Sequence, residues 1–247
     1  MSDARRVNDA RDVSDAPIDL SVIIPCFNEE GSLRACVEET RAALATLGLR
    51  HEILPVDDGS SDGTWALCER LAAESVDVRP RRHVRNRGMG AGVRTGLRAA
   101  RGAFVIVVPG DNQFALDLGA MIEAGRDADV VVGERGTAYA TVGRSLPSWL
   151  YSTGMRALFG LRLRGEVNLY RREFLLAHAI EHRADGFFGN TELLIRAVRA
   201  GARAVRIPVR VRPRVAGRST GRDLGQIWRV VKETAKLRAR LTFEALR

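Results

Sequence analysis

Two oxygen-bearing side chains, Asp111 and Gln113, lie one residue apart directly after a short apolar run. The run, residues 104–108 with the sequence FVIVV, predicts a buried strand that Pro109 and Gly110 end. In an open α/β sheet, ligands bind just beyond the carboxyl ends of the strands. A carboxylate there can bind a hard cation, and the cation can bind a diphosphate. Taken alone, the same residues could also form a polar turn after a core strand.

Two further polar turns follow predicted strands. A strand at residues 20–24 ends at Pro25, where the sequence PCFNEEGS begins, and a strand at 53–56 runs directly into DDGSSDGT, residues 57–64. Each turn alone is more often a loop than a site. Because the carboxyl ends of parallel strands meet at one edge of a sheet, we expect the three turns to lie together.

Together these turns offer the groups that a nucleotide needs. A base and ribose need an aromatic face and hydrogen-bond acceptors, which Phe27, Glu29 and Asp58 could provide. A diphosphate needs a metal or backbone amides, which the pair after the apolar run and the glycine-rich turn at Gly88 and Gly90 could provide.

The elements that must position these turns alternate along the chain. Helical patterns separate the predicted strands at about 33–47, from Ser61 or Asp62 to about 73, up to Gly102, and at about 116–124, and a strand is predicted at 129–133. This alternation predicts a mostly parallel sheet covered by helices on both faces. Beyond Arg135 we expect helices at 150–159, 191–200 and 224–246, and an edge strand at 205–211, which contains a proline.

Composition narrows the possible partners and compartment. The chain has 247 residues with 39 basic and 30 acidic side chains, a net charge of +9 that favours phosphates, a membrane surface or nucleic acid. Three cysteines without a C-x-x-C pair fit a reduced, cytoplasmic compartment. Residues 1–18 are polar and predict a disordered leader. No apolar run approaches the ~18 residues of a spanning helix.

Three segments carry a specific resemblance. VIIPCFNEE, VDDGSSDGT and NRGMGAGVRTG resemble the signatures of family 2 glycosyltransferases with the GT-A fold, in the branch of dolichyl- or polyprenyl-phosphate sugar transferases. The match runs from about Asp19 to Ser219. It implies a GT-A type, Rossmann-like domain at 19–220 and an inverting transfer from a UDP- or GDP-sugar, most simply to a polyprenyl or dolichyl phosphate, with Mg or Mn as the divalent cation.

The resemblance also implies roles for individual residues. Those around the nucleotide would be Pro25, Phe27, Asn28, Glu29, Asp57, Asp58, Asn86, Gly88 and Gly90. Asp111 and Gln113 match the metal ligands of a D-x-D-x-Q pattern, and Asp111, Arg135 and Glu192 would be the catalytic residues. Arg135, Arg214 and Ser219 match positions at the donor and acceptor phosphates. Glu192 could act as a base, hold a sugar hydroxyl, or cap its own helix.

The sequence departs from the family pattern at three places. Pro109 replaces the first acid of D-x-D-x-Q, the segment 163–170 is shortened, and Arg206 stands where an acid commonly precedes I/V-P-V. Two of these changes lie on the acceptor side. A soluble hydroxyl or phosphate acceptor is therefore the alternative to a lipid phosphate; a hydroxyl would need a general base, whereas a phosphate would not.

Other classes of function fit less well. In the run GMGAG, residues 88–92, no G-x-G-x-x-G register fits a nicotinamide-dependent oxidoreductase, and no P-loop pattern exists. A non-catalytic nucleotide-sugar or nucleic-acid binding protein remains an alternative, because residues 79–101 hold eight arginines and no acid. Aromatic residues do not interleave with these arginines, so we expect no nucleic-acid partner.

The C-terminal residues 221–247 predict an amphipathic helix. One face would carry Leu224, Ile227, Trp228, Val231 and Ala235, and the opposite face Arg229, Lys232, Lys236 and Arg240. The helix could pack on the core with a solvated basic back. It could equally place residues 224–247 on an anionic leaflet and make the protein peripheral on the cytoplasmic face of the membrane.

Overall fold

The computed structural model describes residues 17–135, 157–159, 167–186, 188–211 and 224–244. Four predicted features lie wholly or largely outside these residues: the leader, the helix at 150–159, and the phosphate-site residues Arg214 and Ser219. The side chains of Arg135 and of residues 224–230 also lie outside the description.

Eight strands form the sheet in the order β3-β2-β1-β4-β7-β6-β8-β5. Their bounds are β1 Leu20–Cys26, β2 His51–Asp57, β3 Arg81–Arg82, β4 Phe104–Val107, β5 Phe114–Ala115, β6 Val130–Arg135, β7 Val167–Arg171 and β8 Ala204–Val211. The pairs β1–β2, β1–β4, β2–β3 and β6–β8 are parallel, whereas β7 is antiparallel to β4 and β6, and β5 is antiparallel to β8. The predicted mostly parallel sheet is confirmed, with β7 as an inserted antiparallel strand.

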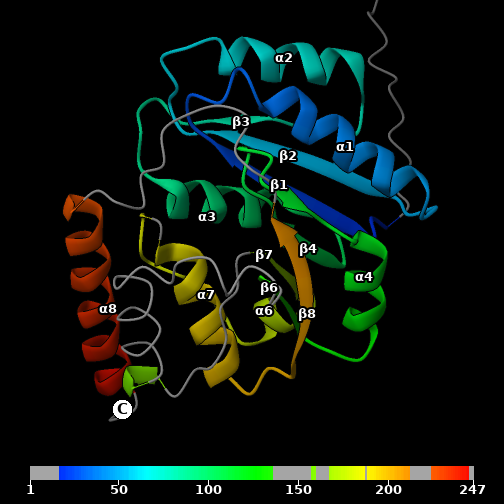
Figure 1. The fold of residues 1–247 in the computed structure, drawn as a ribbon. Coiled ribbons are helices and arrows are strands. Elements are labelled where there is room, and N and C mark those ends of the chain that lie inside the picture. Colours follow the sequence, from blue (N-terminus) through cyan, green and yellow to red (C-terminus); the bar gives the residue numbers. More distant parts are fainter. Residues whose placement is uncertain (1–16, 136–156, 160–166, 187, 212–223, 245–247) are drawn as a thin grey trace, which may run out of the picture.

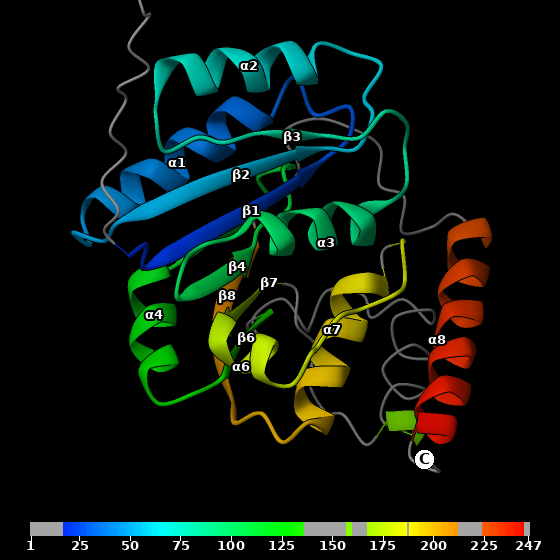
Figure 2. The same ribbon diagram turned by 180° about the vertical axis from the view of Figure 1, so that it is seen from behind.

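Helices cover both faces of the sheet, as predicted (Figures 1 and 2). They are α1 Leu33–Ala45, α2 Thr64–Glu74, α3 Met89–Ala99, α4 Leu118–Arg126, α6 Arg172–Ala177, α7 Phe188–Arg199 and α8 Leu224–Glu244. Successive side chains of a strand point to opposite faces. Accordingly, Val22 of β1 packs with Val37 under α1, α2 and α4, and its neighbour Ile23 packs with Val93 under α3. The α/β fold expected from the sequence, with helices on both faces of one sheet, is confirmed.

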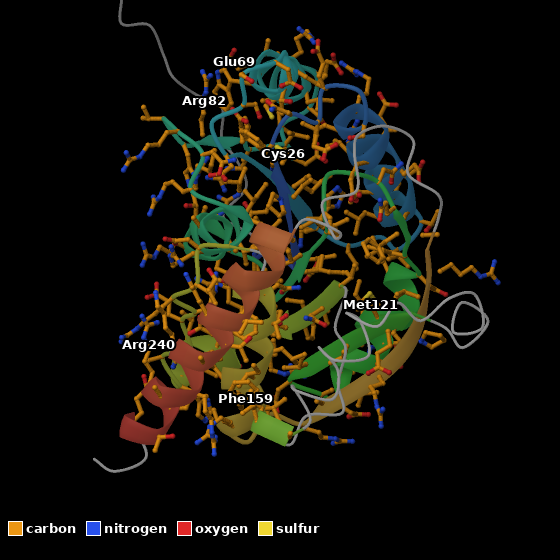
Figure 3. All side chains as sticks on the ribbon, turned by 60° about the vertical axis from the view of Figure 1, so that its left-hand side comes forward. Cys26, Glu69, Arg82, Met121, Phe159 and Arg240 are labelled. Carbon is orange, nitrogen blue, oxygen red and sulfur yellow. The ribbon has the colours of Figure 1, made fainter. Side chains whose placement is uncertain are left out.

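Helix α8 packs against α7 rather than against the sheet (Figure 1). Leu237 and Leu241 are buried with Phe188 and Ile195 of α7, and Figure 3 shows Arg240 on the outer side of the helix. Of the predicted apolar face, Val231 is 51% exposed and Ala235 is also exposed, so these two residues do not pack on the core. The apolar residues of α7 select the stripe through 237 and 241 instead. The alternative, in which the predicted face lies on an anionic leaflet, stays a prediction.

The basic side of α8 is as predicted where the structure describes it: Lys232, Lys236 and Arg240 are exposed. None of the helices in the described ranges is long and apolar enough to cross a membrane. The three cysteines are free and buried.

Candidate functional site

The turns after β1, β2 and β4 meet at one edge of the sheet, as the sequence predicted. Strand β1 is parallel to β2 on one side and to β4 on the other, so their carboxyl ends are adjacent. Oδ1 of Asn28 accepts the amide of Ser61 at 2.9 Å, which joins the first turn to the second. The hydroxyl of Ser32 lies 2.6 Å from Oε2 of Glu29 and 3.0 Å from the carbonyl oxygen of Gly110, which joins the first turn to the third.

The candidate metal ligands flank a residue with left-handed backbone. Asn112, between Asp111 and Gln113, has φ 52°, and its side-chain amide donates to Oε1 of Glu39 in α1 at 3.1 Å. The backbone therefore turns sharply between the two candidate ligands. Oδ1 of Asp111 also accepts the amide of Gln113 at 3.3 Å, which closes the turn.

The residues present fit a hard divalent cation held in part by its substrate. Asp111 and Gln113 offer oxygen ligands, and within the described ranges no group of three or more His, Cys, Asp or Glu side chains could hold a metal ion. Mg²⁺ is commonly bound by one or two carboxylates together with substrate phosphates. Burial and then the charge of Asp111 raise the pKa of the neighbouring Cys36 thiol to about 12.

Asp58, expected at the nucleotide, is 3% exposed and holds the glycine-rich turn. Its Oδ1 accepts Nδ1–H of His83 at 2.7 Å and the amide of Arg87 at 3.0 Å, and its Oδ2 accepts the amide of Gly88 at 2.6 Å. Its neighbour Asp57 is fully buried and lies 3.3 Å from Nε of Arg82. The two acids therefore bind groups of the protein at the edge of the candidate nucleotide site.

The glycines at 88 and 90 allow close packing between backbones. Gly88 has φ 97°, and a Cβ atom on either glycine would overlap the carbonyl oxygens of residues 184–186. The amide of Gly90 donates to the carbonyl of Gly186 at 3.1 Å, and that of Gly88 donates to Asp58. In this structure these amides bond within the protein, which differs from the expectation that they cradle a diphosphate.

Glu192 is 1% exposed and is surrounded by donors. Its Oε2 accepts the amides of Arg183 and Ala184 at 3.0 and 2.8 Å, and its Oε1 accepts Nε of Arg196 at 2.8 Å. Burial alone would raise the pKa of Glu192, but the hydrogen bonds from Arg196 and the two amides outweigh it and lower the pKa.

The expected roles of Glu192 as a base or a sugar contact stay predictions, and its lowered pKa makes it a weaker base than an ordinary glutamate. In this structure its hydrogen bonds run to the segment that precedes α7 and to Arg196 of α7. They do not run to the first turn of α7, where a cap would bind.

The other expected site residues have different surroundings. Phe27 is 43% exposed and can offer an aromatic face, and Asn86 is also exposed, whereas Pro25 is buried within β1. Arg135 ends β6, and β4 and β6 are both antiparallel to β7. The backbone of Arg135 therefore lies at the same edge as Asp111, two strands and roughly 10 Å from β4.

Acids from elsewhere in the chain neutralise most of the arginine-rich run. Glu52 pairs with Arg79 and Arg101, and Asp57 pairs with Arg82. Two further pairs, Arg94–Asp185 and Arg98–Glu181, bring the neutralised arginines to five of eight. The positive charge of this run is therefore smaller than the sequence alone suggests, and the absence of a nucleic-acid partner stays a prediction.

Comparison with known proteins agrees with this geometry. Residues 21–199 match the family model described as glycosyl transferase family 2. Undecaprenyl-phosphate mannosyltransferase of Micrococcus luteus is 30% identical over 76% of this chain and 81% of its own length. Dodecaprenyl-phosphate galacturonate synthase of Rhizobium johnstonii is 30% identical over 64% of this chain, and the match spans 49% of that relative.

A solved structure supports the same fold. Glucosyl-3-phosphoglycerate synthase from Mycobacterium tuberculosis, in complex with Mn²⁺, UDP and phosphoglyceric acid, superimposes with a TM-score of 0.68. It is 19% identical, and the match covers 90% of this chain and 78% of the other. At that identity the likeness concerns the fold.

Proposed function

Because the chain belongs to glycosyl transferase family 2, we propose that it transfers a sugar from a UDP- or GDP-sugar to a polyprenyl phosphate, with inversion and with the help of a divalent cation. The observation that carries the proposal is the convergence of the three polar turns after β1, β2 and β4 at one edge of the sheet. Ligands of open α/β sheets bind at such an edge.

The donor half of the site would hold the nucleotide diphosphate. Phe27 offers a face for the base, and Asp111 and Gln113 would bind the cation together with the diphosphate. When bound, such a cation stabilises the charge that develops on the departing nucleoside diphosphate. Arg135, at the same edge, would add a guanidinium to the phosphate oxygens.

The acceptor is proposed to be a phosphate monoester. A phosphate oxygen attacks the anomeric carbon while the bond from that carbon to the nucleoside diphosphate breaks, and a single displacement of this kind inverts the sugar. Because the attacking oxygen is already an anion, no proton has to be removed. The internal contacts of Glu192 favour such an acceptor, and two relatives are named for polyprenyl-phosphate substrates.

A soluble phosphate-bearing acceptor is the second candidate. It is favoured by the likeness to a synthase crystallised with phosphoglyceric acid, and by the departures from the family pattern at 163–170 and Arg206. Arg206, where an acid was expected, is exposed and lies 3.9 Å from Glu134. A lipid acceptor would require contact with a membrane, for which we propose the exposed basic side of α8.

Two experiments test the proposal, one that identifies the sugar donor and one that identifies the acceptor. Thermal unfolding with a panel of UDP- and GDP-sugars and Mn²⁺ or Mg²⁺ identifies the donor, because a ligand at about 100 times its Kd adds about 2.7 kcal/mol of stability. Transfer is then measured by mass spectrometry with polyprenyl phosphate in vesicles and, in parallel, with soluble phosphate monoesters. Lipid-linked product alone supports the proposal; soluble product alone favours the second candidate; binding of no nucleotide refutes both.

A further inference from the structure

The segment His182–Gly186, here the junction segment, supplies partners for the first turn of α3. The first amides of a helix have no partner within the helix. The amide of Gly90 donates to the carbonyl of Gly186 at 3.1 Å, and the amide of Ala91 donates to the carbonyl of Asp185 at 3.2 Å. Backbone from the region before α7 therefore caps α3, which begins directly after the glycine-rich turn.

The backbones of the junction segment and of the first turn of α3 pack so closely that neither can move alone. A Cβ atom on Gly90 would overlap the carbonyl oxygen of Ala184, and one on Gly189 would lie 2.6 Å from the Cα of Gly90. His182 is fully buried, and its Nε2–H donates to the carbonyl of Gly90 at 2.7 Å. A shift of the junction segment would therefore shift the start of α3.

Two helices fix the junction segment from the other side. Glu192 of α7 accepts the amides of Arg183 and Ala184. The carboxylate of Glu233 of α8 lies against Gly186, with its two oxygens 3.0 and 3.3 Å from a Cβ atom placed on that residue. Carboxylates from α7 and α8 thus contact the junction segment, and the one from α7 binds two of its backbone amides.

The start of α3 is also tied to the end of β2. Asp58 accepts the amide of Gly88, and His83 bridges Asp58 to the hydroxyl of Thr95 in α3, with its two ring nitrogens at 2.7 and 2.8 Å. Asp58 belongs to the second of the three turns that form the candidate donor edge. A continuous set of contacts therefore runs from α8 and α7 to that edge.

We infer that Glu192 and Glu233 are positioning residues, which act through the junction segment on the start of α3 and so on the nucleotide-binding turns after β1 and β2. The inference rests on the proposed nucleotide-sugar donor, and it deepens that proposal by assigning a role to α8. Because α8 contributes one of the two carboxylates, any partner that moves α8 also moves the contact to Gly186.

Glu192→Gln tests the link through α7. A glutamine has one acceptor oxygen where Glu192 uses two, so either the two amides or Arg196 lose their acceptor. We expect the Kd of UDP or GDP with Mn²⁺, measured by calorimetry, to rise roughly 5- to 50-fold, within the usual range of coupling between sites. Glu181→Gln is the matched control, because Glu181 pairs with Arg98 of α3 in an exposed ion pair.

Hydrogen exchange gives a readout that does not need the nucleotide. In folded Glu192→Gln we expect the amides of Gly90 and Ala91 to exchange faster, while amides of β1 keep their protection. A merely structural role would lower the melting temperature and leave both the nucleotide Kd and this local exchange unchanged, and that result would overturn the inference. A wild-type protein that binds no nucleotide would refute the proposed function, but the exchange result would still decide whether the link exists.

The pair Glu233→Gln and Glu233→Ala tests the link through α8. Glutamine keeps a polar side chain of the same size against Gly186, and alanine removes it. We expect the alanine variant to weaken nucleotide binding and to speed exchange at Gly90, and the glutamine variant to match the wild type in both. Equal nucleotide binding and equal exchange at Gly90 in the two variants would show that α8 does not position the start of α3.

Discussion

Asp111 is the residue on which the proposed chemistry depends most. Asp111 lies in the loop after β4 rather than within a strand, so Asp111→Ala should fold normally. Without the carboxylate, the cation loses a protein ligand and the departing diphosphate loses charge stabilisation. We expect Mn²⁺-dependent transfer to fall at least about 10³-fold, a loss of about 4 kcal/mol in transition-state stabilisation.

The control is Pro109→Asp, which restores the acid of the D-x-D-x-Q pattern and should be tolerated. Full metal-dependent turnover by folded Asp111→Ala would show that the cation is held elsewhere.

The pKa of Glu52 leads to a prediction of how the stability of the protein changes with pH. It is 1% exposed and accepts hydrogen bonds from the hydroxyl of Ser21, the amide of Arg101 and the guanidinium of Arg79 at 2.7, 2.7 and 2.6 Å. Burial alone would raise the pKa of Glu52, but these bonds outweigh it and lower the pKa. An acid with a lowered folded-state pKa stabilises the protein above its unfolded pKa, and this stabilisation is lost as the pH falls through the folded pKa.

We therefore expect the free energy of unfolding in urea to fall below about pH 4.5, near the unfolded pKa of glutamate. Glu52→Gln should lose about 1–2 kcal/mol at pH 7, a modest value because both partner arginines are partly exposed, and should be less sensitive to acid. Stability curves of wild type and variant that stay parallel as the pH falls well below about 4.5 would contradict this.

The sequence placed the site residues better than it assigned their roles. Asn28, Asp58 and Asp111 could be placed at one edge because each follows a strand, and alternation with helices predicts that these strands are parallel. The contacts of Asp58 and Glu192 could not be predicted, because they depend on backbone amides that only the fold brings close. The glycines at 88 and 90 were the one sequence signal that two backbone segments pack closely there, and the same glycines suggest phosphate binding equally well.

At the level of elements, α8 has two apolar stripes, and the one that contains Leu237 packs against α7. Leu237 is 2% exposed against α7, and Val231 is 51% exposed. Leu237→Ala should lower the free energy of unfolding by about 2–3 kcal/mol, because it leaves a cavity in a packed interface. Val231→Ala should change it by less than about 0.5 kcal/mol. Urea denaturation measures both, and equal losses would mean that the outer stripe is also covered.

Strands β3, β5 and β7 were not predicted from the sequence, because none of them shows a readable period of apolar residues. Strands β3 and β5 have two residues each, too few to show a period. Strand β7 lies between β4 and β6 and is antiparallel to both, so it breaks the alternation from which the sheet was predicted. Its side chains are buried almost throughout, which gives no alternating pattern to read.

For the whole molecule, the net charge of +9 is less uniform than the sequence suggests. Much of the arginine-rich face near α3 is neutralised by ion pairs, whereas Lys232, Lys236 and Arg240 of α8 are exposed. Charge that is exposed on one element can act on an anionic surface within a Debye length, about 8 Å at physiological salt. The exposed side of α8 is therefore the surface from which we expect membrane attraction.

Replacing Lys232, Lys236 and Arg240 with glutamine tests this expectation. Each basic residue near an anionic leaflet contributes about 1 kcal/mol, so the triple variant should bind vesicles rich in anionic lipid on the order of 100-fold more weakly. Flotation with increasing anionic lipid and increasing salt measures the effect. The matched control replaces three exposed arginines away from α8, Arg50, Arg70 and Arg126, with glutamine. Equal losses in the two variants would indicate attraction by net charge alone, and no binding by the wild type would favour the soluble acceptor.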